Sequence, residues 1–241
     1  MNATLPFSLP PMCWRPPVTS PKTLPPAVSP VHGRLALGGI GLAVAISIDL
    51  HLRLSGQVSP IWQTLSEYVY GKLGSSSAAP LFSAMCLALS LGSVALLTGI
   101  AKAHRPGTTA VCVLLGVWSA GLLVCGLVPV DPDGQARSLS GQVHNIAALT
   151  AFVALPAAAF VLTRRGRERC PWEPRRTTIR RLATASFASI GIVLAGFVCT
   201  LVIGPAQQDI TLGLFERLLF TIDVALLLTM VRPLVAASRR Y

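Results

Sequence analysis

Residues 141–163 read GQVHNIAALTAFVALPAAAFVLT and contain no aspartate, glutamate, lysine or arginine. A helix of about 20 apolar residues, rising ~1.5 Å per residue, is long enough to cross the ~30 Å hydrocarbon core of a bilayer. In lipid the backbone must satisfy its own hydrogen bonds, which a helix does within one segment. This run therefore predicts a membrane-spanning helix.

Five further apolar runs of similar length occur along the chain. Of its 241 residues 52% are hydrophobic and only 12% are charged, and the mean hydropathy is +0.64, whereas a soluble domain is about 25% charged. The expected fold class is an all-α, polytopic transmembrane helical bundle. We expect a proline-rich, disordered tail at 1–32, a short basic tail at 236–241, and a membrane domain at 33–235 with spans near 34–54, 78–101, 109–130, 141–163, 182–204 and 213–235.

The net charge is +11, which in a soluble protein would favour a nucleic-acid partner. Here we interpret the basic residues as topology signals beside membrane helices, so membrane lipids and no nucleic acid are the expected partners. Sixteen of the 20 lysines and arginines fall on one side of the six predicted spans. The positive-inside rule then places both termini in the cytoplasm of a multi-pass protein of the bacterial inner membrane. The loop between the fourth and fifth spans holds Arg164, Arg165, Arg167, Arg169, Arg175, Arg176, Arg180 and Arg181.

Most acidic residues fall toward the opposite, outer side. The segment DPDG, residues 131–134, has the composition of a turn, and Ser140 is expected to cap the fourth helix. Alternatively, Asp131 or Asp133 acts with His144 to bind a cation or move a proton. His144 is equally expected to hydrogen-bond a loop carbonyl.

Asp223 lies near the middle of the last predicted span. An acid at that depth costs at least ~2.5–3.5 kcal/mol on insertion scales, so it should be protonated, paired or facing a wet cavity. Glu216, seven residues earlier, shares its helix face, while Arg217 points about 100° away. A structural tie between helices and a polar cavity open to the outside are both compatible with this pattern.

The first outer loop and the end of the first span add further polar residues. Asp49 and Arg53 have the i, i+4 spacing of an intrahelical ion pair. Tyr68 and Tyr70 are expected to anchor at the lipid interface, and Glu67 to join the acidic cluster. The six cysteines lack the spacing of a zinc or redox motif, and no cofactor or metal is predicted.

Four stretches carry a family resemblance: LSEYVYGKLG at 65–74, GLVPVDPDG at 126–134, SGQVHNIAALTAFVALPAA at 140–158 and GLFERLL at 213–219. In this order they resemble the bacterial and archaeal membrane family called domain of unknown function 998, over roughly residues 33–235. The resemblance implies six helices and an unassigned activity, and supplies no substrate. The family commonly has threonine where Val130 stands here. The positions that match its pattern are Ser66, Glu67, Tyr68, Pro129, Asp131, Pro132, His144, Glu216 and Arg217.

Three alternative functional hypotheses are consistent with these observations. The first is an outer polar cluster that binds a small ion, a proton or a lipid headgroup; its members are Glu67, Asp131, His144, Glu216, Arg217 and Asp223. The second is a membrane-embedded enzyme acting on a lipid at the outer face, with His144 and carboxylates as metal ligands or acid and base. The third is a structural or interaction protein whose arginine-rich loop binds anionic lipid headgroups.

Overall fold

The computed structural model describes residues 30–102, 108–132, 135–136, 138–164, 171–203 and 212–236. Within these ranges six helices are long and apolar enough to cross a membrane, which confirms the predicted all-α, six-span fold. They are α1 (Pro30–Leu54), α2 (Ala79–Lys102), α3 (Thr108–Leu127), α4 (Leu139–Leu162), α5 (Arg176–Ile203) and α6 (Leu212–Ala236). The short elements are the 3₁₀ helices η1 (Leu65–Tyr70) and η2 (Glu173–Arg175) and the antiparallel strands β1 (Lys72–Leu73) and β2 (Ser76–Ser77).

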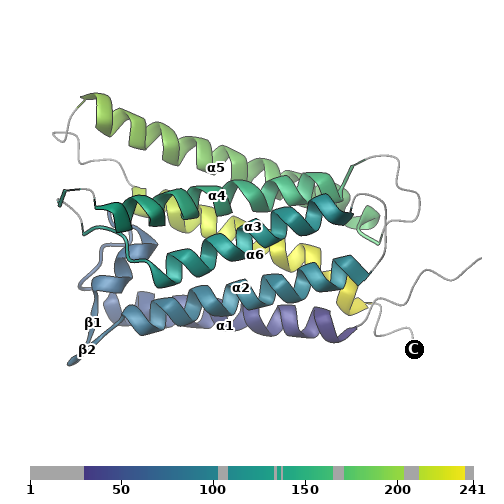
Figure 1. Ribbon diagram of the computed structural model, residues 1–241, viewed down its shortest axis with the longest axis horizontal. Helices are drawn as coiled ribbons and strands as arrows, with labels where there is room; N and C mark the ends of the chain where they lie inside the picture. The colour runs from purple at the N-terminus through teal and green to yellow at the C-terminus, as the bar shows by residue number, and fades with distance from the viewer. Residues whose placement is uncertain are drawn as a thin grey trace, which may run out of the picture.

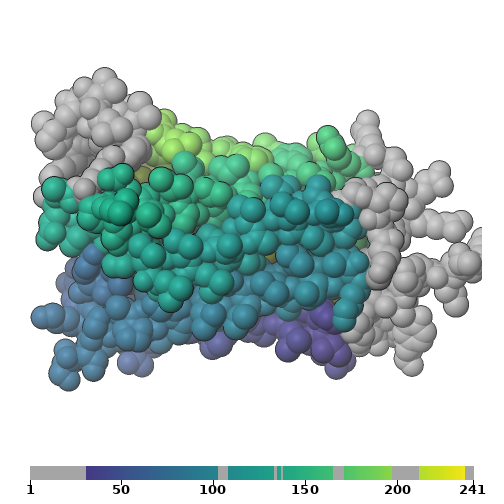
Figure 2. All heavy atoms as spheres, in the orientation of Figure 1, coloured from purple at the N-terminus to yellow at the C-terminus, as the bar shows by residue number. Residues whose placement is uncertain are grey.

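The helices run side by side in an elongated bundle (Figure 1). Each helix packs against the next one along the chain, and α6 returns to pack against α1. In Figure 2, α2, α3 and α4 cover one face of this bundle with closely packed side chains. We call the end with η1 and the α3–α4 connection the acidic end, because it carries Glu67 and Asp131. The opposite end, with η2, Arg164, Arg176 and Arg180, is the arginine end.

Several helix ends differ from the expected ones. The helix α3 ends at Leu127 rather than at 130, because Pro129 disfavours helical backbone at Val128 and has no N–H of its own. The helix α5 begins at Arg176 rather than near 182, so its first turns carry arginines. The helix α1 begins at Pro30, inside the predicted tail, where proline suits the first turn. The predicted tails at 1–29 and 237–241 lie outside the described residues.

Ser138, and not Ser140, caps α4. Its backbone is extended, and its Oγ accepts a hydrogen bond of 3.0 Å from the Gly141 N–H, which is the geometry of an N-cap. The prediction for Ser140 was wrong because α4 begins at Leu139, two residues before the apolar run starts. Ser140 lies inside the first turn and donates to the Pro129 carbonyl at 3.1 Å.

The helices α1 and α2 come into backbone contact at Gly39. A β-carbon added there would lie 2.7 Å from both Ala88 O and Gly92 Cα, whereas one added at Gly38 or Gly41 would meet nothing within 4 Å. Of the three small residues that the sequence offers in this run, Gly39 is therefore the one that lets the helices approach.

The helix α5 is attached to the bundle mainly by its first half. Among residues 176–196, the part of α5 whose side chains the structure describes, the buried ones lie between Ile179 and Ile190, and none of residues 191–196 is buried. Figure 1 shows α5 diverging from its neighbours toward its C-terminal end. At the arginine end, by contrast, the buried Trp172 donates from Nε1 to the Met230 carbonyl at 2.8 Å and ties the α4–α5 connection to α6.

Candidate functional site

The 3₁₀ helix η1 is held together by Glu67. The Glu67 carboxylate accepts hydrogen bonds from the Thr64 N–H at 3.0 Å, the Thr64 hydroxyl at 2.9 Å and Gln63 Nε2 at 2.9 Å. This arrangement is a capping box, in which the N3 carboxylate satisfies the N-terminal donors of its own helix. The oxygens of Glu67 are thus engaged locally.

Two adjacent residues of α6 fasten η1 to the bundle. Glu216 Oε2 accepts a hydrogen bond of 2.7 Å from the Leu65 N–H. Arg217 Nη1 donates to the carbonyls of Pro60, Gln63 and Gly213 at 3.0, 2.6 and 3.0 Å. Because Glu216 and Arg217 point in different directions around α6, together they hold the loop from two sides.

The two tyrosines of η1 have different surroundings. Tyr68 is fully buried, its hydroxyl lies 2.9 Å from His51 Nδ1, and the Arg217 guanidinium lies 5.2 Å from its ring centroid. The prediction that Tyr68 anchors at the lipid interface was therefore wrong. Tyr70 is exposed and donates from its hydroxyl to the Val130 carbonyl. Partial burial and then the charges of Asp131 and Glu67 raise the pKa of Tyr70.

The connection between α3 and α4 is fixed by side chains of α4 and its cap. Asp131 accepts hydrogen bonds from the Ser138 N–H at 2.9 Å and the Ser138 hydroxyl at 2.5 Å. The buried His144 donates from Nδ1 to the Val128 carbonyl at 2.7 Å, which is the loop-carbonyl interpretation of this histidine. In the neutral ring this bond assigns the proton to Nδ1 and leaves Nε2 as an acceptor.

A cavity of about 50 Å³ lies inside the acidic end, among η1, α2, α3, α4 and α6. Its polar lining comes from Ser66, His144 and Glu216, which are brought together from three elements. The rest of the lining is apolar or sulfur-bearing, including Cys86, Cys125, Met85 and Trp118. A buried water needs roughly 10–15 Å³ and two or more polar partners, so the cavity has room for a few water-sized groups.

Asp223 belongs to a separate buried pair. Ser186 of α5 donates from Oγ to Asp223 Oδ1 at 2.7 Å, and both side chains are buried. The other oxygen, Oδ2, is buried and has no hydrogen-bond partner within the described part of the chain. The pairing of Asp223 across two helices matches the structural-tie interpretation, and Asp223 does not line the cavity beside His144.

Comparison with known proteins identifies the family of this chain. The model of the family described as "Protein of unknown function (DUF998)" matches residues 36–232. The chain belongs to the DUF998 family. No curated protein and no solved structure matches it at a significant level. All three polar residues of the cavity in this DUF998 protein fall inside the matched range.

The DUF998 chain brings together only part of the predicted acidic cluster. Of the predicted cluster, His144 and Glu216 line the cavity, where Ser66 joins them. Glu67 and Asp131 instead accept hydrogen bonds at the starts of η1 and α4. Arg217 lines a groove between α1 and α6 instead. Asp133 lies outside the described residues.

Two polar partners in the DUF998 fold were not predicted from the sequence. Ser186 gives no signal of its own, since serine is common in membrane helices. His51, near the end of α1, pairs with Tyr68 across 17 residues of chain, and no sequence pattern predicted this contact. The predicted Asp49–Arg53 ion pair is confirmed at 2.8 Å. Within the described ranges, no group of three or more histidine, cysteine, aspartate or glutamate side chains could hold a metal ion.

Proposed function

We propose that the protein binds a small hydrogen-bond-donating cation, or a proton carried by water, in the cavity beside His144 and Glu216. The observation that carries the proposal is the convergence of Ser66, His144 and Glu216 on one cavity of about 50 Å³. That volume suits a ligand the size of a few waters and is small for a lipid headgroup.

The chemistry of the lining favours a donor. His144 Nδ1 is committed to Val128 and Glu216 Oε2 to Leu65, so the remaining acceptor atoms are Nε2 of the imidazole and Oε1 of the carboxylate. No lysine or arginine lines the described cavity, because Arg217 is directed to loop carbonyls and to the Tyr68 ring. The charge of the neighbouring Arg217 acts on Glu216 from outside the cavity. Inside the cavity, a buried carboxylate is stabilised further by a proton or a cation.

The position of the cavity suits exchange with one side of the membrane. It lies under η1 and the α3–α4 connection, at the end that the arginine distribution predicts to face outward. Because His144 and Glu216 themselves hold those loops, ligand binding and loop closure use the same two side chains.

The test uses the purified full-length protein in detergent. Thermal unfolding is measured in sodium, potassium, ammonium and choline salts at several pH values, because a ligand that binds only the folded state raises the unfolding temperature. The Glu216→Gln variant keeps a carbonyl oxygen for the Leu65 N–H but removes the charge. The matched control is Asp49→Asn, an acid at the same end that pairs with Arg53 and does not line the cavity.

We expect ammonium, the one small hydrogen-bond-donating cation of the four, or lowered pH to stabilise the wild type and Asp49→Asn relative to choline. Glu216→Gln should lose this response while still folding. An identical response in Glu216→Gln, or no response in the wild type to any cation or pH, would overturn the proposal and leave these residues with a purely structural role in fastening the loops.

A further inference from the structure

We propose a second site, at the arginine end, that binds an anionic phospholipid in the groove between α4 and α5. The groove has a volume of about 750 Å³, and its lining includes Arg164, Arg176 and Arg180 together with Phe160 and Phe187. A neighbouring hollow of about 570 Å³ continues along α5 and shares Arg176 and Arg180. Grooves of this size hold ligands larger than a single ion.

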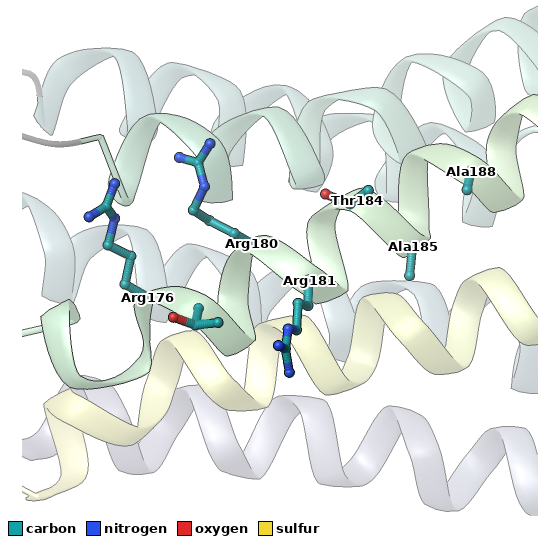
Figure 3. Close-up of a pocket in the computed structure, with 7 residues that line it drawn as sticks. Arg176, Arg180, Arg181, Thr184, Ala185 and Ala188 are labelled. Carbon is teal, nitrogen blue, oxygen red and sulfur yellow. The ribbon is translucent and has the colours of Figure 1, made fainter.

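Two of the arginines are held in place by the fold. Arg176 donates from Nε to the Thr163 carbonyl at 2.9 Å, and Arg180 lies with its guanidinium carbon 5.0 Å from the Phe160 ring centroid. Figure 3 shows Arg176 and Arg180 pointing to the same side of α5, and Arg181 pointing away from them. Residues four apart share a helix face, so the sequence spacing and the close-up agree.

The positive charge of the groove is not neutralised by any acidic residue that lines it. Three arginines and no carboxylate line it in the described residues. Glu173 approaches Arg176 only at 3.7 Å, with its side chain 58% exposed, and exposed pairs of this kind contribute little. Guanidinium groups bind phosphate oxygens through paired N–H donors, so a phosphate diester complements this surface.

Below the arginines the groove becomes apolar. The rings of Phe160 and Phe187 are stacked with centroids 6.0 Å apart. Phe160 precedes Arg164 by about 6 Å along α4, and Phe187 follows Arg180 by about 10 Å along α5, both toward the middle of the span. A ligand with a phosphate head and an acyl chain meets both parts, whereas free phosphate meets only the first.

The depth of the arginines also fits a lipid. Arg176 and Arg180 lie in the first two turns of α5, at the edge of a span that covers Glu173–Gly196. Headgroups of a bilayer occupy this level at the ends of spanning helices. The arginine distribution predicts that this end faces the cytoplasm, where anionic lipids attract basic pockets between helices.

The experiment titrates the full-length protein in detergent with phosphatidylglycerol, with phosphatidylcholine of the same chains and with inorganic phosphate, and counts bound lipid by native mass spectrometry. The test variant is Arg164→Gln/Arg180→Gln. The matched control, Arg175→Gln/Arg232→Gln, removes the same charge from the same end at residues that do not line the groove. A third variant, Phe187→Ala, removes no charge.

We expect phosphatidylglycerol to bind the wild type and the control alike, and the test variant roughly 10- to 30-fold more weakly. Phe187→Ala should weaken binding without changing its salt dependence. Equal loss in both double variants, equal binding of the two lipids, or displacement of the lipid by inorganic phosphate would overturn the proposal. If the test variant does not fold, unchanged phosphatidylglycerol binding by Phe187→Ala would also overturn it.

Discussion

Ser186 and Asp223 form a hydrogen bond of 2.7 Å between α5 and α6, with both side chains buried. It joins the most loosely attached helix of the bundle to α6, one of the helices that contact η1. Asp223 Oδ2 has no partner within the described residues. The hydroxyl of Ser186 is therefore the identified contact that offsets the free-energy cost of burying the Asp223 carboxyl group.

Replacing Ser186 by alanine should therefore destabilise the protein by about 1–3 kcal/mol, since it leaves a buried acceptor unsatisfied. The measurement is thermal or denaturant unfolding in detergent, with Ser189→Ala, another buried serine of α5, as the control. In an Asp223→Leu background the Ser186→Ala change should cost much less. Equal costs in both backgrounds would show that the pair is not coupled.

Arg217 should not be replaceable by lysine. Its Nη1 contacts the loop carbonyls of Pro60 and Gln63 and the Gly213 carbonyl of α6, and its guanidinium faces Tyr68. An ammonium cannot reproduce this planar geometry. We expect Arg217→Lys to cost at least about 1.5 kcal/mol and to increase hydrogen exchange across residues 60–70. Arg53→Lys, at an exposed ion pair, should change neither quantity measurably. Unchanged exchange in Arg217→Lys would mean that the loop is held by other contacts.

The contact at Gly39 gives a matched pair of glycine substitutions. A β-carbon at Gly39 would meet backbone atoms of α2, which cannot move aside, whereas Gly38 faces open space. Gly39→Ala should destabilise the protein by about 1–3 kcal/mol through overpacking. Gly38→Ala should be neutral or stabilising by up to about 1 kcal/mol because alanine is the better helix former. Unfolding temperatures that move in the same direction for both would contradict this interpretation.

Gly141 should be coupled to Asp131. A β-carbon at 141 would fall on the Asp131 carboxylate, which accepts two hydrogen bonds from Ser138 at the start of α4. Gly141→Ala should displace that carboxylate and cost about 0.5–2 kcal/mol, the usual worth of a helix cap. In an Asp131→Ala background most of this cost should disappear. A double-mutant cycle on the unfolding free energy measures the coupling.

The spans could be predicted because a bilayer leaves few alternatives. Apolar runs of about 20 residues must form helices to satisfy their own backbone, and all six appear. Predictions made from short stretches of sequence failed at the helix ends and in the connecting loops. Ser138 caps α4 although the apolar run begins later, and Tyr68 is buried although its loop was expected to lie at the interface.

The candidate site depended on packing between distant segments. Residue types and family resemblance singled out His144 and Glu216. They did not predict that Ser66 joins them, or that Glu67 and Asp131 accept hydrogen bonds at the starts of η1 and α4. Likewise, nothing in the order of residues indicated that Ser186 would face Asp223. The hydropathy and charge of a segment determine whether that segment spans the membrane, so the spans can be predicted from the sequence one segment at a time. The partner of a polar side chain depends on the rotation and depth of each helix, which only the packing of all six decides.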